Sequence, residues 1–224
     1  MPDLLTSIDR LEKLYLTTML GSAVGVNDTI QDLRRKFYGG IADGTTGLLG
    51  ALGLQSYVSG RFYLGLYNPG SSNVQAMVLQ QVNFVPIIIF KQTTFAAIGI
   101  SVNVAAATAI CRLGIYNDGG GRPTTRVKEF GSTVDASTTG FKEIVEATVL
   151  SPGIYWLAVV NQTAIVTLEA RNTNENYLTS QASGADVIAN NGTPRQSAVA
   201  GALPTPAVQD SIGASCPTIS LRAA

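Results

Sequence analysis

The feature that most constrains this 224-residue chain is a succession of short apolar segments between residues 84 and 161, separated by turn-forming residues. Residues 95–104 alternate between apolar and smaller or polar side chains. The alternation shifts by one residue at Ala96 and Ala97, which is typical of a β-strand with a bulge. Residues 87–90 are apolar on both faces, which is typical of a strand that is covered on two sides. Residues 154–160 form the most apolar segment of the chain, so we expect a strand in the core. The pattern indicates antiparallel β-structure.

Turn chemistry divides these segments from one another. Residues 117–123 read Asn-Asp-Gly-Gly-Gly-Arg-Pro, and the glycines permit positive φ in a wide turn. The Ser-Pro-Gly at 151–153 predicts a tight turn into the strand that holds the only tryptophan, Trp156. We therefore place Trp156 in the core. Pro86 interrupts another apolar run and is expected at a sheet edge or a bulge.

The predicted fold class is mainly β, a jelly-roll-like antiparallel β-sandwich preceded by a small region of short α-helices. About eight to ten strands are expected within residues 56–224, with turns roughly every ten residues. Residues 171–215 are rich in Asn, Ser, Ala, Gly, Thr and Pro, and are predicted to form a long loop that is held in place by its neighbours or by other subunits. A short closing strand follows at 218–222.

Residues 1–55 have a different period, with apolar side chains three and four positions apart. The predicted partner-binding residues are Leu4, Ile8, Leu11 and Tyr15 in the first helix and Ile30, Leu33 and Phe37 in the second. Such short helices are marginal alone and must bury their apolar faces. We expect this region to attach the chain to another protein or to drive trimerisation, and packing against its own sandwich is the alternative.

The amino-acid composition argues against several classes of function. The chain is 46% hydrophobic and 13% charged, with 15 basic and 15 acidic residues and therefore no net charge. A balanced charge argues against a nucleic-acid surface, and it gives little electrostatic repulsion between copies, as suits a subunit of an assembly. The chain has no histidine, so triads and metal sites that require one are excluded. We predict no catalytic residues, no metal site and no cofactor.

The two cysteines, Cys111 and Cys216, each lie in an apolar strand-like run. Two buried free thiols are the favoured interpretation, and a disulfide that closes a long loop is the alternative. No secretory signal and no apolar run long enough for a membrane span are recognised, so no membrane insertion is expected.

Two other sequence patterns are of a kind that can bind a ligand. Asn117 and Asp118 could offer oxygen ligands to calcium, but an Asx-turn is the favoured interpretation. Exposed tyrosines are typical sugar-stacking groups, and half-buried strand aromatics are the alternative to that role. The glycan-binding candidates are Tyr63, Tyr67 and Tyr116, together with Tyr155.

Three segments carry a resemblance to a known family. Residues 94–100 (TFAAIGI), 112–123 (RLGIYNDGGGRP) and 150–158 (LSPGIYWLA) resemble a β-sandwich module of tailed-bacteriophage virion proteins. The closing residues 217–222 (PTISLR) are similar to the last strand of that module, and the amino-terminal units resemble small helical repeats of similar phage proteins.

The resemblance implies a non-enzymatic virion structural protein, most simply a tail fibre or a fibre-like baseplate or adaptor subunit in a homotrimer. Its partners would be other virion proteins and, at the host surface, a glycan. The alternatives are a capsid decoration or head-fibre protein, and a carbohydrate-binding module of a host-adsorption protein. The expected location is the virion, at the tail rather than the capsid surface.

Overall fold

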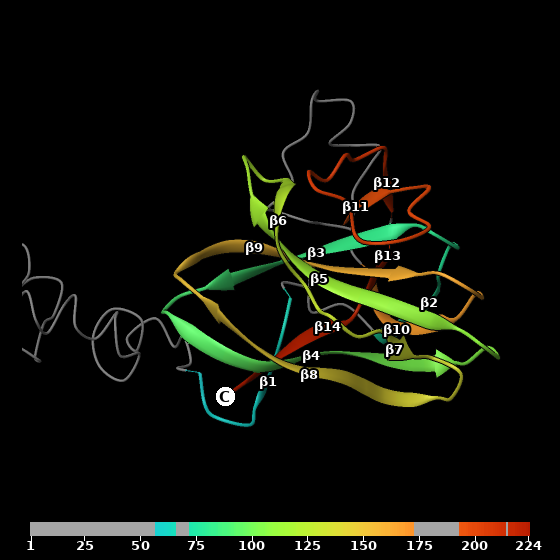
Figure 1. Cartoon of the computed structure of the whole chain (residues 1–224), viewed down its shortest axis with the longest axis horizontal. Coiled ribbons are helices and arrows are strands. Elements are labelled where there is room, and N and C mark those ends of the chain that lie inside the picture. The colour runs from blue at the N-terminus through green and yellow to red at the C-terminus, as the bar shows by residue number, and fades with distance from the viewer. Residues whose placement is uncertain (1–56, 66–71, 173–192, 214) are drawn as a thin grey trace, which may run out of the picture. The chain divides into compact units, whose positions relative to one another are not determined.

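The computed structural model describes residues 57–65, 72–172, 193–213 and 215–224. The predicted amino-terminal helices lie outside the described residues, together with the seven partner-binding candidates. Two antiparallel sheets of seven strands each account for the described fold (Figure 1). The prediction of a mainly β, sandwich-like domain is therefore confirmed.

The first sheet, sheet A, is centred on β4 (Thr93–Val104). β8 (Gly140–Leu150) pairs with one edge of β4. The other edge is shared by β14 (Ile219–Ala223) and β10 (Thr167–Asn172). The remaining strands of sheet A are β1 (Phe62–Leu64), β2 (Ser72–Ala76) and β13 (Ser215–Pro217).

The second sheet, sheet B, is built around three long strands. β9 (Gly153–Asn161) lies between β3 (Val82–Ile89) and β5 (Ile110–Asp118). The remaining strands of sheet B are β6 (Pro123–Glu129), β7 (Val134–Asp135), β11 (Thr193–Gln196) and β12 (Ser211–Gly213).

Alternation along the strands directs one set of apolar side chains between the sheets. Ile98 and Ile100 of β4 and Leu221 of β14 are at most 1% exposed. Leu113 and Leu157, on the central strands of sheet B, are fully buried. Successive residues of a strand point to opposite faces, so these side chains form the core of the sandwich.

The bulge predicted in residues 95–104 is present. The register of β4 shifts at Ala96 against both of its neighbours, between Phe95 and Ala97 on the β8 side and opposite Arg222 and Ala223 on the β14 side. The shift lets Phe95 and Ile98 both point inward, although three positions separate them.

Pro86 lies in β3 without any bulge, because the register with β9 runs unbroken through the Pro86–Trp156 pair. β11 covers the opposite edge of β3 only at Val82 and Asn83. Among the described residues Pro86 therefore borders an unpaired edge, where a missing N–H group removes no ladder hydrogen bond.

Residues 193–213 correct the prediction of a long loop over 171–215. They include β11 and β12, and the structure describes fourteen strands where about eight to ten were expected. Residues 197–210, here called the strap, lie between these two strands and cross the outer face of sheet B. Short polar strands such as Thr193–Gln196 have no apolar alternation, so the sequence pattern did not reveal them.

Candidate functional site

The strap covers a second apolar cluster on the outer face of sheet B. The buried strand residues of this cluster are Val82, Phe84, Tyr116, Trp156, Ala158 and Val160. The strap contributes Val199 and Leu203, which are 7% and 2% exposed. Sheet B is thus buried on both faces, which explains why residues 154–160 are apolar without alternation.

An edge-to-face ring contact and a glycine that makes room for a strap side chain allow close packing in this cluster. The rings of Phe84 and Tyr116 meet edge to face with centroids 5.1 Å apart. The Tyr116 hydroxyl donates a hydrogen bond of 2.7 Å to the carbonyl oxygen of Pro204 in the strap. A Cβ atom at Gly114 would lie 2.4 Å from Cδ1 of Leu203, so only glycine leaves room for this side chain.

A bulge in β6 gathers charged side chains beside the strap. Lys128 pairs with Ile115 but Arg126 pairs with Tyr116, so Val127 is an extra residue in β6. The bulge places Arg126 and Glu129 on the same face of the sheet, although they are three positions apart. That face is the one that the strap covers.

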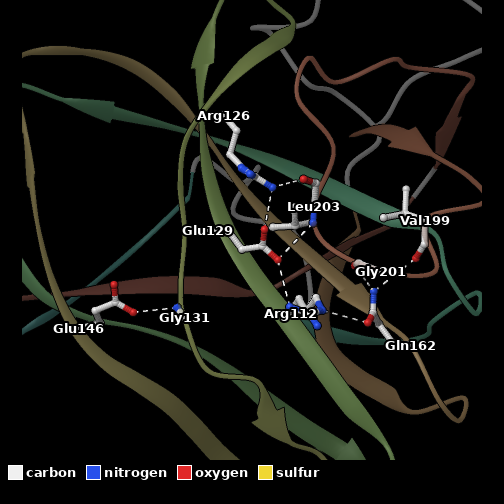
Figure 2. A network of polar contacts seen from close by, with 9 residues as sticks. All are labelled: Arg112, Arg126, Glu129, Gly131, Glu146, Gln162, Val199, Gly201 and Leu203. Atoms are coloured by element: carbon white, nitrogen blue, oxygen red, sulfur yellow. Dashed lines mark hydrogen bonds and ion pairs between the residues drawn. The ribbon is translucent and has the colours of Figure 1, made fainter.

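Glu129 is the centre of the resulting polar network (Figure 2). Its Oε2 accepts a hydrogen bond of 2.6 Å from Nη1 of Arg126, and its Oε1 lies 3.2 Å from Nη1 of Arg112. The backbone N–H of Leu203 also donates to Oε1 at 3.2 Å, and Arg126 in turn donates to the Leu203 carbonyl oxygen. The carboxylate therefore joins β5, β6 and the strap.

Gln162 extends the network to the start of the strap. Nε of Arg112 donates to Oε1 of Gln162 at 3.0 Å, while Nε2 of Gln162 donates to the carbonyl oxygens of Gly201 at 2.5 Å and Val199 at 3.4 Å. Arg126 and Glu129 of β6 thus hold the strap at Leu203, and Gln162, which directly follows β9, holds it at Val199 and Gly201 (Figure 2).

An open depression of about 600 Å³ lies beside this network. Its lining is mostly the segment from Arg126 to Gly131, completed by Arg112 and by Ala202 of the strap. The Arg112 and Arg126 side chains are 30% and 25% exposed, so their remaining N–H groups can meet solvent. Fixed guanidinium donors of this kind suit hydroxyl or carboxylate oxygens of a ligand.

Lys128 and Glu146 tie this side of sheet B to β8 of sheet A. Nζ of Lys128 lies 3.0 Å from Oε1 of Glu146 and donates a 2.7 Å hydrogen bond to the carbonyl oxygen of Ala147. The N–H of Gly131 donates to Oε2 of Glu146 at 2.8 Å. This hydrogen bond and the adjacent ammonium hold the pKa of Glu146 below its ordinary value.

The tyrosines proposed for glycan binding differ in their exposure to solvent. Tyr116 is 0% exposed, which corrects its assignment as a glycan-stacking residue because neither ring face reaches solvent. Tyr63 on β1 and Tyr155 on β9 are half-buried. Tyr67 lies outside the described residues, so glycan binding at Tyr63 and Tyr67 stays a prediction.

The Asp118 turn forms as an Asx-type turn. Oδ2 of Asp118 accepts a 3.3 Å hydrogen bond from the Gly121 N–H, and Oδ1 accepts one of 2.8 Å from Nε1 of Trp156. Gly120 and Gly121 have φ values of 68° and 82°, as the glycine run predicted. Within the part of the chain that the structure describes, no group of three potential metal ligands occurs.

Cys111 and Cys216 are free and buried, which confirms the favoured interpretation of the two thiols. Burial raises the pKa of Cys111 to about 12 and raises that of Cys216 as well. Each thiol is therefore protonated at neutral pH and behaves as a small apolar group.

The sequence indicated none of the residues of the Glu129 network as a group. Glu129 is one of 15 acidic residues scattered along the sequence, and Arg112 and Gln162 lie 17 and 33 positions from it. Only strand pairing brings them together. In the four described ranges, no helix is long and apolar enough to cross a membrane.

Comparison with known proteins identifies no family. No protein-family model matches the chain, and no curated protein matches it. Among solved structures, the chain is similar to chitosan-binding module 1 of a chitosanase/glucanase from Paenibacillus sp. IK-5, with 16% sequence identity and a TM-score of 0.30. The alignment covers 45% of this chain and 74% of that module, a level of similarity that carries no argument about ligand.

Proposed function

We propose that this chain is a non-enzymatic structural protein of a bacteriophage virion, a tail fibre or a fibre-like baseplate or adaptor subunit. In this proposal the amino-terminal region attaches the chain to other virion proteins, and a jelly-roll-like sandwich is displayed in a homotrimer. The proposal rests on the sequence resemblance and on how its segments lie together.

The observation that carries the proposal is that the two most specific segments form one structural unit. Residues 112–123 supply β5 and its turn, and residues 150–158 supply the start of β9, which pairs with β5. Tyr116 lies directly opposite Trp156, and Trp156 donates to the carboxylate of Asp118. The shared residues are therefore coupled in the fold, as expected of a module that is kept as a unit.

Gold labelling of the particle tests the proposal and separates it from the nearest alternative. An antibody raised against the folded sandwich should label the tails of intact particles. Label confined to the capsid surface would favour a decoration or head-fibre protein. Recovery of the chain from lysed host cells, with no label on any particle, would contradict both.

A carbohydrate-binding role is the second candidate, and the depression beside Glu129 is the observation that favours it. Arg112 and Arg126 there offer guanidinium groups of the kind that bind sugar hydroxyl or uronate oxygens. A glycan array with the folded chain tests this role. If binding occurs, it should weaken when Arg112 is changed to Ala. Absence of binding to acidic and neutral glycans would remove this candidate.

A further inference from the structure

The outer face of sheet A carries a group of exposed apolar side chains. Phe62, Leu64, Phe141, Val145 and Val149 are 46%, 45%, 50%, 70% and 56% exposed. We call this group the Phe141 face. In contrast to the outer face of sheet B, which the strap covers, it is open to solvent in the part of the chain that the structure describes.

Strand register shows that these side chains share one face. Phe62 lies opposite Arg222, Arg222 opposite Ala97, and Ala97 opposite Val145. Directly paired residues project to the same side of a sheet, so this row crosses β1, β14, β4 and β8 on one side.

A parallel row of paired residues makes room for the Phe141 ring. Leu64, Ser220 and Gly99 pair in succession across β1, β14 and β4. Ser220 and Gly99 are small, so they leave space above the sheet, and the Phe141 ring lies over Gly99. The ring meets Phe62 edge to face at 5.0 Å, which joins the two margins of the face into one apolar surface.

The charges on this face neutralise each other. Arg222 donates to both carboxylate oxygens of Glu143 at 3.0 and 3.1 Å, a bidentate pair. The side chains are 25% and 29% exposed, so an approaching surface can reach them. A surface of this kind offers an opposite charge to Arg222 and to Glu143 of another copy of the chain.

We infer that the Phe141 face is the contact through which copies of this chain associate, so its occupant is a second copy of the chain. In such a contact Arg222 can lie against the partner's Glu143, and Phe62 and Val145 lose their contact with water. The chain has equal numbers of basic and acidic residues, so no net repulsion opposes the association. This inference rests on the proposed homo-oligomer and names its surface.

Cross-linking of the full-length chain tests the inference. Both native cysteines are buried and free, so a single introduced cysteine is the reactive thiol. Val145→Cys treated with a short bis-maleimide should give a covalent dimer. Val208→Cys is the matched control, because Val208 is 61% exposed and belongs to the strap on the other sheet. The control should stay uncross-linked at the same concentration.

Sedimentation of Val145→Glu supplies a second measurement. It should shift the chain to a smaller species, and Val208→Glu should not. Three outcomes would overturn the inference: equal cross-linking of both cysteine variants, free maleimide labelling of Val145→Cys without a covalent dimer, and protection of Val145→Cys in a monomer. The second outcome leaves the face to another protein, and the third to a segment of the same chain.

The same experiments distinguish this inference from the proposed function. A Val145→Cys dimer together with absence of the chain from particles would keep the contact and remove the virion role. If the chain stays monomeric in these experiments but the antibody labels it on phage tails, the virion role is kept and the contact is removed.

Discussion

At the scale of single residues, small side chains decide what can lie above each sheet. Gly114 makes room for Leu203 of the strap, and Gly99 makes room for the Phe141 ring. Both glycines lie within strands, where glycine has a low β-propensity, and the close approach of another group explains their presence. The sequence showed where glycines occur, but the neighbours that need them come from distant segments.

Gly99→Ala should destabilise the domain and disturb the Phe141 face. The new Cβ would lie 2.5 Å from Cζ of Phe141 and 2.9 Å from the Lys142 carbonyl oxygen, so the ring and the strand must move. We expect a loss of about 1–3 kcal/mol in the free energy of unfolding, measured by urea denaturation. Gly201→Ala is the control, since nothing lies within 4 Å of its Cβ position. Equal effects of the two changes would contradict this account.

Alkaline pH should weaken the fold through the buried thiols. Burial raises the pKa of Cys111 from 9.0 to about 12 and raises that of Cys216, so the folded protein keeps protons that the unfolded chain releases. Their contribution to stability is complete below pH 9 and is lost as the pH rises from 9 towards 12. Each thiol should lower the free energy of unfolding by about 1.4 kcal/mol per pH unit in that range.

The pH effect is measured by urea denaturation between pH 7 and 11. Cys111→Ala should unfold at lower urea throughout but with a smaller dependence on pH. Tyr116, whose pKa burial also raises, acts in the same direction in both proteins. An unchanged pH dependence in the variant, or rapid labelling of native protein by a thiol reagent, would argue against the buried, protonated thiols.

At the scale of elements, the strap and the two bulges set the arrangement of side chains. The bulge in β4 could be predicted because apolar residues on both sides of Ala96 reveal the change of phase. The bulge at Val127 could not, since β6 consists mainly of polar and charged residues and has no clear alternation. The strap was also missed, because isolated anchors such as Val199 and Leu203 in a polar segment form no period.

Glu129→Gln should loosen the strap. The amide cannot match a carboxylate that accepts from Arg112, Arg126 and the Leu203 N–H, so we expect a loss of about 1–2 kcal/mol in the free energy of unfolding. Hydrogen exchange at the Leu203 amide should accelerate, and acrylamide should quench Trp156 more strongly. Trp156 is the sole tryptophan and belongs to the cluster that the strap covers.

Glu169→Gln is the matched control for this change, because it makes the same substitution at a half-buried position of β10. It should leave exchange at Leu203 and Trp156 quenching as they are in the unchanged protein. If the control and Glu129→Gln loosen the strap equally, the specific role of the Glu129 network is wrong.

At the scale of the whole molecule, the two outer faces of the sandwich differ. The outer face of sheet B is closed by the chain's own strap, and that of sheet A presents the Phe141 face. A homotrimer would bury the exposed face, and we expect sedimentation equilibrium at micromolar concentration to give the mass of three chains. A monomer under these conditions would contradict the proposed trimer. Strand content and the buried Trp156 could be predicted from the sequence, whereas the difference between the faces depends on long-range pairing.

The central claim is that this chain is a structural component of a phage particle. The most direct measurement is the amount of the chain that co-sediments with intact particles in a density gradient, quantified by mass spectrometry against the major capsid protein. The account predicts a fixed ratio across the particle peak that survives a high-salt wash. A chain found only in the soluble fraction at the top of the gradient, with none in the particle peak, would contradict it.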